Sequence, residues 1–329
     1  MQAGTSRATL AAAAAAAFVG GAVMSLQSRI NGELSTSFKA PLDAAMWSFG
    51  SGAVLLSLLL LAAPGVRAAV RDLPAALRDG RLSWWQCLGG LGGGAFVVAQ
   101  TYAVPLAGVA IFTIAVVGGQ TGNALLVDKL GLGPAGKAPV TPARAASAAL
   151  AFVGVVVAVS ARGGGGGESV VVPALVAAFV GALMTVQQAT NGRVGAETGS
   201  AMATTWLNFT VGTCFLVLAG LLQAGTGSLR SPATLHVPWW AWLGGMCGIA
   251  FIFMAAVVVR YLGVLLFTLV MLTGQLSAAV ALDLLTPATR SHIGVQVVLG
   301  ILVTLVAAGA AGVTSRRATQ RPEPQRSLA

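Results

Sequence analysis

The chain has 329 residues, of which 56% are hydrophobic and 9% are charged, and its mean hydropathy is +0.85. A soluble globular domain has about 25% charged residues, because its surface must face water. A charged content of 9% therefore excludes a soluble fold of this size. The formal net charge of +10 does not indicate a nucleic-acid partner. The basic residues are scattered between apolar runs and form no stripe interleaved with aromatic side chains.

Ten apolar runs follow one another along the chain, each close to the length of about 20 residues that an α-helix needs to cross a bilayer. They are too long and too uniform for the alternating strands of a membrane β-barrel. We therefore predict an all-α integral membrane protein that is surrounded by the lipid bilayer. The predicted spans cover residues 8–28, 43–63, 84–104, 107–127, 144–161, 170–190, 203–222, 239–259, 262–282 and 292–313.

The basic residues between these spans predict the orientation of the chain. Of the nineteen Lys and Arg residues, fourteen fall on the side of the N-terminus and five on the opposite side. Cytoplasmic loops carry the excess of Lys and Arg in membrane proteins. We therefore expect both termini in the cytoplasm and the protein in the inner or plasma membrane of a bacterial-type cell.

The chain contains an internal repeat. Residues 84–128 align without a gap with residues 239–283, at a constant offset of 155 and with 17 identities in 45 positions. Repeated Ala, Val and Leu can match by chance in an apolar chain, whereas rarer residues do not readily do so. The rarer matches are Trp84 with Trp239, Phe96 with Phe251, Gln120 with Gln275 and Asp128 with Asp283.

The first helices of the two halves repeat at an offset of 160, with Gln27 matching Gln187 and Asn31 matching Asn191. Each half then holds five helices, and because five is odd the second half must enter the membrane from the opposite side. We predict two inverted five-helix repeats. The expected domains are a first repeat, a Gly-rich linker, a second repeat and a disordered cytoplasmic tail, at residues 1–162, 163–169, 170–315 and 316–329.

Inverted repeats are typical of secondary transporters, whose substrate site lies near the bilayer midplane between the halves. We predict a carrier for a small polar metabolite or drug-like solute, working by alternating access around a midplane cavity. A channel or facilitator, an intramembrane enzyme and a structural membrane protein remain alternatives. An enzyme would need a catalytic constellation, and His236 and His292 are the only histidines and belong to no such motif. We expect no catalytic residue, metal or cofactor, and the sequence leaves monomer or homodimer open.

The segments Gln27–Gly32 and Gln187–Gly192 resemble the motif of the YdcZ family of bacterial membrane proteins. This family belongs to the drug/metabolite transporter (DMT) superfamily, alongside the EamA-like permeases. Many members have a single five-helix half, and this chain resembles a fused two-half form over nearly its whole length. The resemblance implies a DMT/EamA-like fold and, since many members of the superfamily are exporters, an efflux function. It does not name the cargo.

Side-chain amides in the spans are the candidate substrate ligands. Gln27 and Asn31 are four residues apart, as are Gln187 and Asn191, so each pair lies on one helix face. An amide can donate and accept hydrogen bonds to a polar solute. The alternative for the two Asn-Gly steps is that they end the first helix of each half.

Three further amides lie deep in the predicted spans. Gln120 and Gln275 occupy equivalent positions, and Asn123 lies one turn after Gln120 with no polar counterpart in the second half. Polar residues at such a depth face the bundle interior or a cavity. They are candidate substrate ligands, with hydrogen bonding between helices as the alternative.

The acidic residues all lie in loops or at span ends, so the sequence predicts no central proton relay. This favours uniport, or coupling through acids near the helix ends. Solvated helix-end charges are the alternative to a gating or coupling role. The candidate gate or coupling residues are Glu33, Glu197, Asp128 and Asp283.

Overall fold

The computed structural model describes residues 7–134, 136–160, 169–225, 237–290 and 293–319, and its regular structure is helical throughout these ranges. Most of the predicted linker, the end of the predicted tail and both histidines lie outside the described residues. The elements are α1 (Arg7–Phe38), α2 (Pro41–Ala62), α3 (Pro64–Arg78), η1 (Trp84–Leu88), α4 (Gly89–Leu130), α5 (Pro142–Ser160), α6 (Val171–Thr198), α7 (Ala201–Gly225), η2 (Trp239–Leu243), α8 (Gly244–Leu285), α9 (Pro287–Arg290) and α10 (Val295–Thr319).

Within the described residues, seven helices are long and apolar enough to cross a membrane, and two shorter apolar helices accompany them. The prediction of an all-α membrane protein is therefore confirmed. The seven are Arg7–Phe38, Pro41–Ala62, Trp84–Leu130, Pro142–Ser160, Val171–Thr198, Ala201–Gly225 and Leu266–Leu285, and the shorter two are Trp239–Ile252 and Val295–Ala310.

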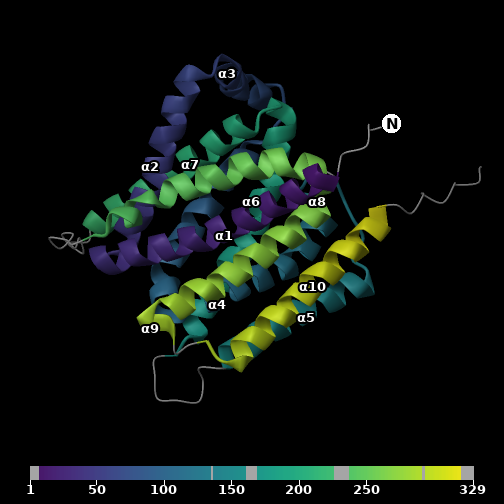
Figure 1. Cartoon of the computed structure of the whole chain (residues 1–329). Coiled ribbons are helices and arrows are strands. Elements are labelled where there is room, and N and C mark those ends of the chain that lie inside the picture. Colours follow the sequence, from purple (N-terminus) through teal and green to yellow (C-terminus); the bar gives the residue numbers. More distant parts are fainter. Residues whose placement is uncertain (1–6, 135, 161–168, 226–236, 291–292, 320–329) are drawn as a thin grey trace, which may run out of the picture.

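The helices pack in pairs that join the two halves of the chain (Figure 1). The first helix of each half lies along the longest helix of the other half, so that α1 packs on α8 and α6 packs on α4. The helices α2 and α7 pack on each other on one flank of the bundle, and α5 and α10 pack on each other on the other flank. The core between the halves is therefore built from both halves together.

Glycines allow backbones to touch where the first helices meet the long helices. A Cβ on Gly21 of α1 would lie 1.9 Å from the carbonyl oxygen of Met271 in α8. At the equivalent position of the other pair, a Cβ on Gly181 of α6 would lie 2.2 Å from the carbonyl oxygen of Val116 in α4. Helix association in lipid depends on such close packing, because lipid tails are as apolar as the side chains. These glycines fix the register of both pairs.

The long helix α4 is broken at Gly108, whose φ of 83° and ψ of 166° are not helical. Such a positive φ is readily available to glycine, which has no Cβ. Pro105, one turn earlier, lacks the N–H of a helical hydrogen bond. The break falls close to residues 105–106, where the sequence predicts the boundary between two spans.

Two helical segments differ from the expected boundaries. None of the predicted spans covers residues 64–83, where the structure contains the additional helix α3 at Pro64–Arg78. It buries Leu73 and Ala76 in a small cluster with Leu82 and Val194 of α6, and its basic residues lie on the partly or fully exposed side. At the other end of the chain, α10 continues to Thr319, past residue 316, where the sequence predicts that the tail begins.

We expect Gly21→Ala and Gly181→Ala each to lower the stability of the protein, because the added Cβ would overlap a backbone oxygen that cannot move aside alone. Overpacking of this kind costs about 1–3 kcal/mol. The measurement is the midpoint of thermal unfolding of the purified protein in detergent. The matched control is Gly122→Ala on α4, where a Cβ would have nothing within 4 Å. Equal midpoints for all three variants would contradict the proposed role of the two glycines.

Candidate functional site

The alternative that Asn31 and Asn191 end their helices is wrong. The helix α1 continues to Phe38 and α6 continues to Thr198, seven residues beyond each asparagine. The glycines that follow them are not among the residues with positive φ. Both asparagines instead direct their side chains sideways to neighbouring helices, and a Cβ on Gly32 would lie 2.8 Å from Val104 of α4. The glycine therefore serves close packing and not a helix end.

A buried chain of polar side chains joins α1 to α4. The Nδ2 of Asn31 donates to Oε1 of Gln100 at 2.8 Å, and Nε2 of Gln100 donates to Oγ of Ser28 at 2.7 Å. Asn31 and Gln100 are both 0% exposed. These bonds satisfy both ends of the Gln100 amide and the Nδ2 of Asn31 in a part of the bundle that is removed from water.

A second chain of amides lies in the other half. The Nε2 of Gln187 donates to Oδ1 of Asn208 at 3.1 Å, and Nδ2 of Asn208 donates to Oδ1 of Asn191 at 3.3 Å. All three amides therefore belong to one network between α6 and α7. The structure brings the predicted pair Gln187 and Asn191 together through a residue of the neighbouring helix.

The two glutamines approach a pair of stacked rings between the halves. The rings of Phe49 on α2 and Phe209 on α7 stack with centroids 4.7 Å apart and an interplanar angle of 22°. The Nε2 of Gln27 and a ring carbon of Phe209 both lie beside Gly248 of α8. In the equivalent arrangement, Nε2 of Gln187 and a ring carbon of Phe49 lie beside Gly93 of α4. We call the four side chains Gln27, Phe49, Gln187 and Phe209 the central cluster.

The other predicted amides lie along the helix pairs and not in the central cluster. Nδ2 of Asn123 donates to the carbonyl oxygen of Ala182 at 2.8 Å, which joins α4 to α6. The backbone oxygen of Gln120 accepts from Thr185 Oγ1 at 3.2 Å in the same pair. In the α1–α8 pair, the backbone oxygen of Gln275 accepts from the Ser25 hydroxyl at 2.6 Å. The bond from Asn123 joins two helices, which is the alternative to substrate binding that the sequence left open for this residue.

Asp283 is not a solvated charge at a helix end, because it is 1% exposed. Its two carboxylate oxygens accept from the backbone N–H of Val109 at 3.0 Å and of Ala110 at 2.8 Å. These N–H groups begin the second segment of α4, just after the break at Gly108, and the first N–H groups of a helix need acceptors from outside it. The carboxylate from the second half therefore caps a helix of the first half. A Cβ on Gly108 would lie 2.7 Å from the same carboxylate.

The equivalent residue Asp128 has a different partner. It pairs with Arg144 of α5, whose side chain is 4% exposed while that of Asp128 is 42% exposed. A second nitrogen of Arg144 donates to the carbonyl oxygen of Pro139 at 3.0 Å. The two aspartates of the repeat are therefore held in different surroundings.

Glu33 and Glu197 both take part in ion pairs. Glu33 pairs with Arg29 one turn earlier at 2.9 Å, and the Arg29 guanidinium lies 6.0 Å from the ring centroid of Trp240. This arrangement leaves both charged side chains a quarter exposed. The pair belongs to the end of α1 and does not reach the central cluster.

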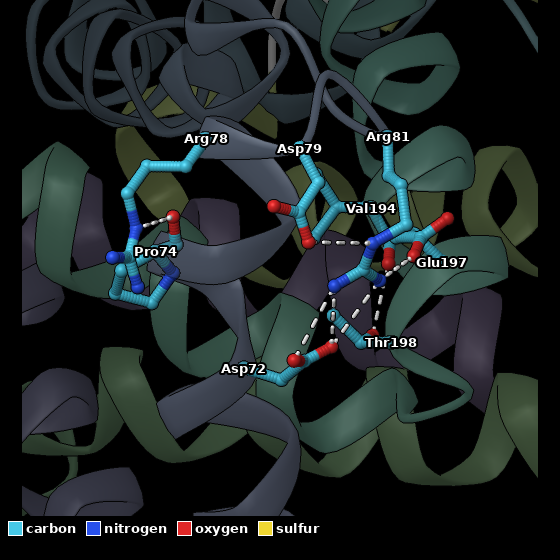
Figure 2. Close-up of polar contacts among 8 residues, drawn as sticks. All are labelled: Asp72, Pro74, Arg78, Asp79, Arg81, Val194, Glu197 and Thr198. Carbon is cyan, nitrogen blue, oxygen red and sulfur yellow. Dashed lines mark hydrogen bonds and ion pairs between the residues drawn. The ribbon is translucent and has the colours of Figure 1, made fainter.

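Glu197 belongs to a cluster of charges around Arg81 (Figure 2). The Arg81 guanidinium hydrogen bonds to Glu197 at the end of α6 and to Asp72 of α3, at 3.2 Å in the latter case, and lies 3.7 Å from Asp79. Hydrogen bonding to Glu197 is the main reason that the pKa of Arg81 is raised above its ordinary value. This cluster connects α3 and the segment before η1 to α6 of the second half.

The family model described as "Putative inner membrane exporter, YdcZ" (DMT_YdcZ) matches residues 12–157 and 172–310 of the chain. The two matched regions together cover most of both predicted repeats. The chain belongs to the DMT_YdcZ family. Membership in this family of inner membrane exporters makes the protein a membrane transporter in general terms. The resemblance seen in the two Gln-to-Asn-Gly segments is thereby confirmed.

A comparison with solved structures supports the fold of this DMT_YdcZ protein. One solved structure, described only as "Crystal structure of protein", aligns with a TM-score of 0.54 at 20% sequence identity. The alignment covers 95% of this chain and 99% of the other. At this identity the similarity concerns the fold alone. No curated protein matches the chain.

Sequence reasoning missed Gln100 and Asn208, which connect the predicted amides in this DMT_YdcZ chain. Both are polar residues within predicted apolar spans, at 84–104 and 203–222. The rule that selected Gln120 would have selected them too. Neither has an amide counterpart, because the repeat places Ala255 opposite Gln100 and Ser48 opposite Asn208.

The central cluster combines two amides with two Phe rings that belong to the main apolar core, so its own polar groups are neutral hydrogen-bonding groups. Within the part of the chain that the structure describes, no group of three or more His, Cys, Asp or Glu side chains is placed to hold a metal ion.

We expect Asp283→Ala to destabilise the protein by about 2–3 kcal/mol, because two buried N–H groups would lose a carboxylate acceptor. The measurement is the thermal unfolding midpoint in detergent. Asp79→Ala is the control, since that side chain is 62% exposed and exposed ion pairs contribute about 0–1 kcal/mol. A similar loss in both variants would argue against the capping role of Asp283.

Proposed function

We propose that the protein is a secondary carrier that exports a small polar or drug-like solute by alternating access between two inverted halves. The observation that carries this proposal is the equivalent placement of Gln27 and Gln187 beside the stacked Phe49 and Phe209. Each half supplies one Gln and one Phe to the central cluster. A solute bound there would contact both halves and would sense their relative movement.

We propose ten membrane crossings. The stretch Trp84–Leu130 has 47 residues, about twice what one crossing needs, and its helix is broken at Gly108. If this stretch crosses twice and the shorter helices Trp239–Ile252 and Val295–Ala310 also cross, the seven long spans become ten. Five crossings per half, residues 1–162 and 170–315, would place the halves in opposite orientations, with both termini in the cytoplasm.

The glycine contacts support the inverted relation of the halves. Gly21 and Gly181 are equivalent in the repeat, and so are their partners Met271 and Val116. Each half thus offers the same surface to the other. Two such halves have two arrangements of similar energy, one open to each side of the membrane, which is the basis of alternating access.

The different partners of Asp283 and Asp128 support a gating role for both. Asp283 holds the broken helix α4 across the interface between the halves, whereas Asp128 pairs within its own half with Arg144. We propose that the two aspartates exchange these roles as the carrier changes state. Glu33 and Glu197 then belong to ion pairs that form and break at the two ends of the bundle.

The test is flux in proteoliposomes loaded with an equimolar mixture of polar solutes: amides, amino acids, amines and sugars. Mass spectrometry of the retained solutes identifies what the wild type moves, relative to liposomes without protein. We expect Gln27→Leu/Gln187→Leu to reduce this flux at least tenfold, because both amides of the central cluster are lost. Gel filtration and the unfolding midpoint report whether the variant is folded.

The matched control is Gln223→Leu, which makes the same replacement on α7, far along the chain from both glutamines. Stimulation of flux by the same solute on the opposite side separates a carrier from a channel. Wild-type flux in a folded double variant would contradict the proposed site. Absence of solute-specific flux in the wild type would contradict the carrier.

A further inference from the structure

The hydrogen bonds of the first half determine which side-chain atom of Asn31 has no hydrogen-bond partner. The Ser28 hydroxyl donates its single proton to the carbonyl oxygen of Met24 at 3.1 Å, so its oxygen can only accept from Gln100. Gln100 then presents Nε2 to Ser28 and Oε1 to Asn31, which must donate with Nδ2. The remaining atom, Asn31 Oδ1, is buried and has no partner among the described residues. It is a free hydrogen-bond acceptor.

In the second half, the equivalent acceptor is occupied. Asn191 Oδ1 accepts from Nδ2 of Asn208, and Oδ1 of Asn208 accepts from Nε2 of Gln187. One carboxamide thus bridges a donor and an acceptor. The repeat places Ser48 opposite Asn208, and its shorter hydroxyl is also buried without a partner among the described residues. The first half therefore lacks the bridging carboxamide.

The glycines of α4 and α8 show that the surrounding atoms are otherwise alike. The Cβ position of Gly93 lies 3.1 Å from Gln187 Nε2 and 3.1 Å from Asn208 Oδ1. The Cβ position of the equivalent Gly248 also lies 3.1 Å from Gln27 Nε2. Beyond Gln27, its only neighbour within 3.9 Å is a ring carbon of Phe209. No atom equivalent to Asn208 Oδ1 lies within 3.9 Å of the Gly248 Cβ position.

The acceptors are placed alike as well. The Cβ position of Gly244 lies 2.3 Å from Asn31 Oδ1, and that of the equivalent Gly89 lies 2.5 Å from Asn191 Oδ1. The first half therefore keeps a donor, Gln27 Nε2, and an acceptor, Asn31 Oδ1, in the arrangement that holds a carboxamide in the second half.

We propose that this arrangement, formed by Gln27, Asn31, Ser48, Gly248 and Phe209, is a binding subsite for a carboxamide-like group of the transported solute. The inference rests on the proposed carrier function and names the chemical class of its substrate. The solute's carbonyl oxygen accepts from Gln27 Nε2, and its N–H donates to Asn31 Oδ1. The solute takes the place that Asn208 takes in the other half.

This chemistry separates carboxamides from related groups. A carboxylate has no donor for Asn31 Oδ1, and a ketone lacks the N–H. An ammonium group has no acceptor for Gln27 Nε2. Leaving a buried polar group unpaired is costly, and sites built on hydrogen bonds discriminate strongly for this reason. Amides, ureas and cyclic amides carry the required adjacent donor and acceptor.

The test uses benzamide, whose ring suits the neighbouring Phe209, with benzoate and acetophenone as analogues that lack the donor. We expect 10 mM benzamide to raise the unfolding midpoint of the purified wild type by about 2–4 °C, since it binds only the folded protein. Benzoate and acetophenone should give no comparable shift. Titration calorimetry should report one benzamide per chain.

Ser48→Asn should supply the missing carboxamide from the chain itself and weaken benzamide binding at least tenfold. Ser160→Asn, at the exposed end of α5, is the matched control and should bind as the wild type does. In Ser48→Asn/Asn208→Ser the two residues exchange places, so the subsite moves to Gln187 and Asn191 and binding returns. Asn208→Ser alone should bind two benzamides per chain, which tests the idea even where Ser48→Asn does not fold.

Equal shifts with benzamide and benzoate, no shift with benzamide, or unchanged binding in folded Ser48→Asn would each overturn the subsite. These outcomes are distinct from failure of the carrier. Solute flux that depends on Gln27 and Gln187 but does not prefer amides would leave the carrier in place without this subsite. Benzamide binding that Ser48→Asn removes, in a protein without flux, would support the subsite and contradict the carrier.

Discussion

The close approach of helix backbones at Gly21 and Gly181 is the constraint on which the rest of the structure depends. Helices in lipid gain no hydrophobic free energy from associating, so tight packing and hydrogen bonds must hold them together. Each glycine faces a backbone carbonyl oxygen of a helix from the other half. Because Gln27 and Gln187 lie six residues after these glycines on the same helices, the same contacts position both amides beside the stacked Phe rings.

Buried polar groups impose the second constraint. A polar side chain inside a membrane protein is costly unless it is hydrogen bonded or functional. In the second half Asn208 joins Gln187 to Asn191 and leaves Gln187 Oε1 without a partner, whereas in the first half Gln100 bonds Asn31 through Nδ2 and leaves Asn31 Oδ1 without one among the described residues. Ser48 and Asn208 occupy equivalent positions in the repeat, and the proposed subsite rests on this difference of one side chain.

Charge is confined to the ends of the bundle, where it joins the halves. Asp283 caps the second segment of α4, and Arg81 links α3 to Glu197 of α6. Both contacts join a residue of the first half to a residue of the second. The central cluster itself consists of amides and aromatic rings, which suits a neutral polar solute.

The sequence alone indicated an all-α membrane protein and its family. Apolar runs of about 20 residues require helices in lipid, and the repeated Gln-to-Asn-Gly segments indicated the DMT_YdcZ family. Gln27 and Gln187 were predicted from the sequence because they recur at equivalent positions of the repeat, whereas Gln100 and Asn208 have no amide counterpart and were missed. The sequence did not show that Asn31 and Asn191 lie within their helices, since the Asn-Gly step is equally consistent with a helix end.

Only the tertiary structure decided which residues act together. The partners of Asn31, Asn208 and Asp283 come from other helices, and in the case of Asp283 from the other half. Local sequence carries no record of such partners, because they depend on how helices pack at a distance along the chain. Asp283, for example, is buried against the N–H groups of Val109 and Ala110, which follow the break at Gly108 in another helix. Composition alone indicates that the protein lies in a lipid bilayer, whereas helix packing determines which polar side chains contact one another.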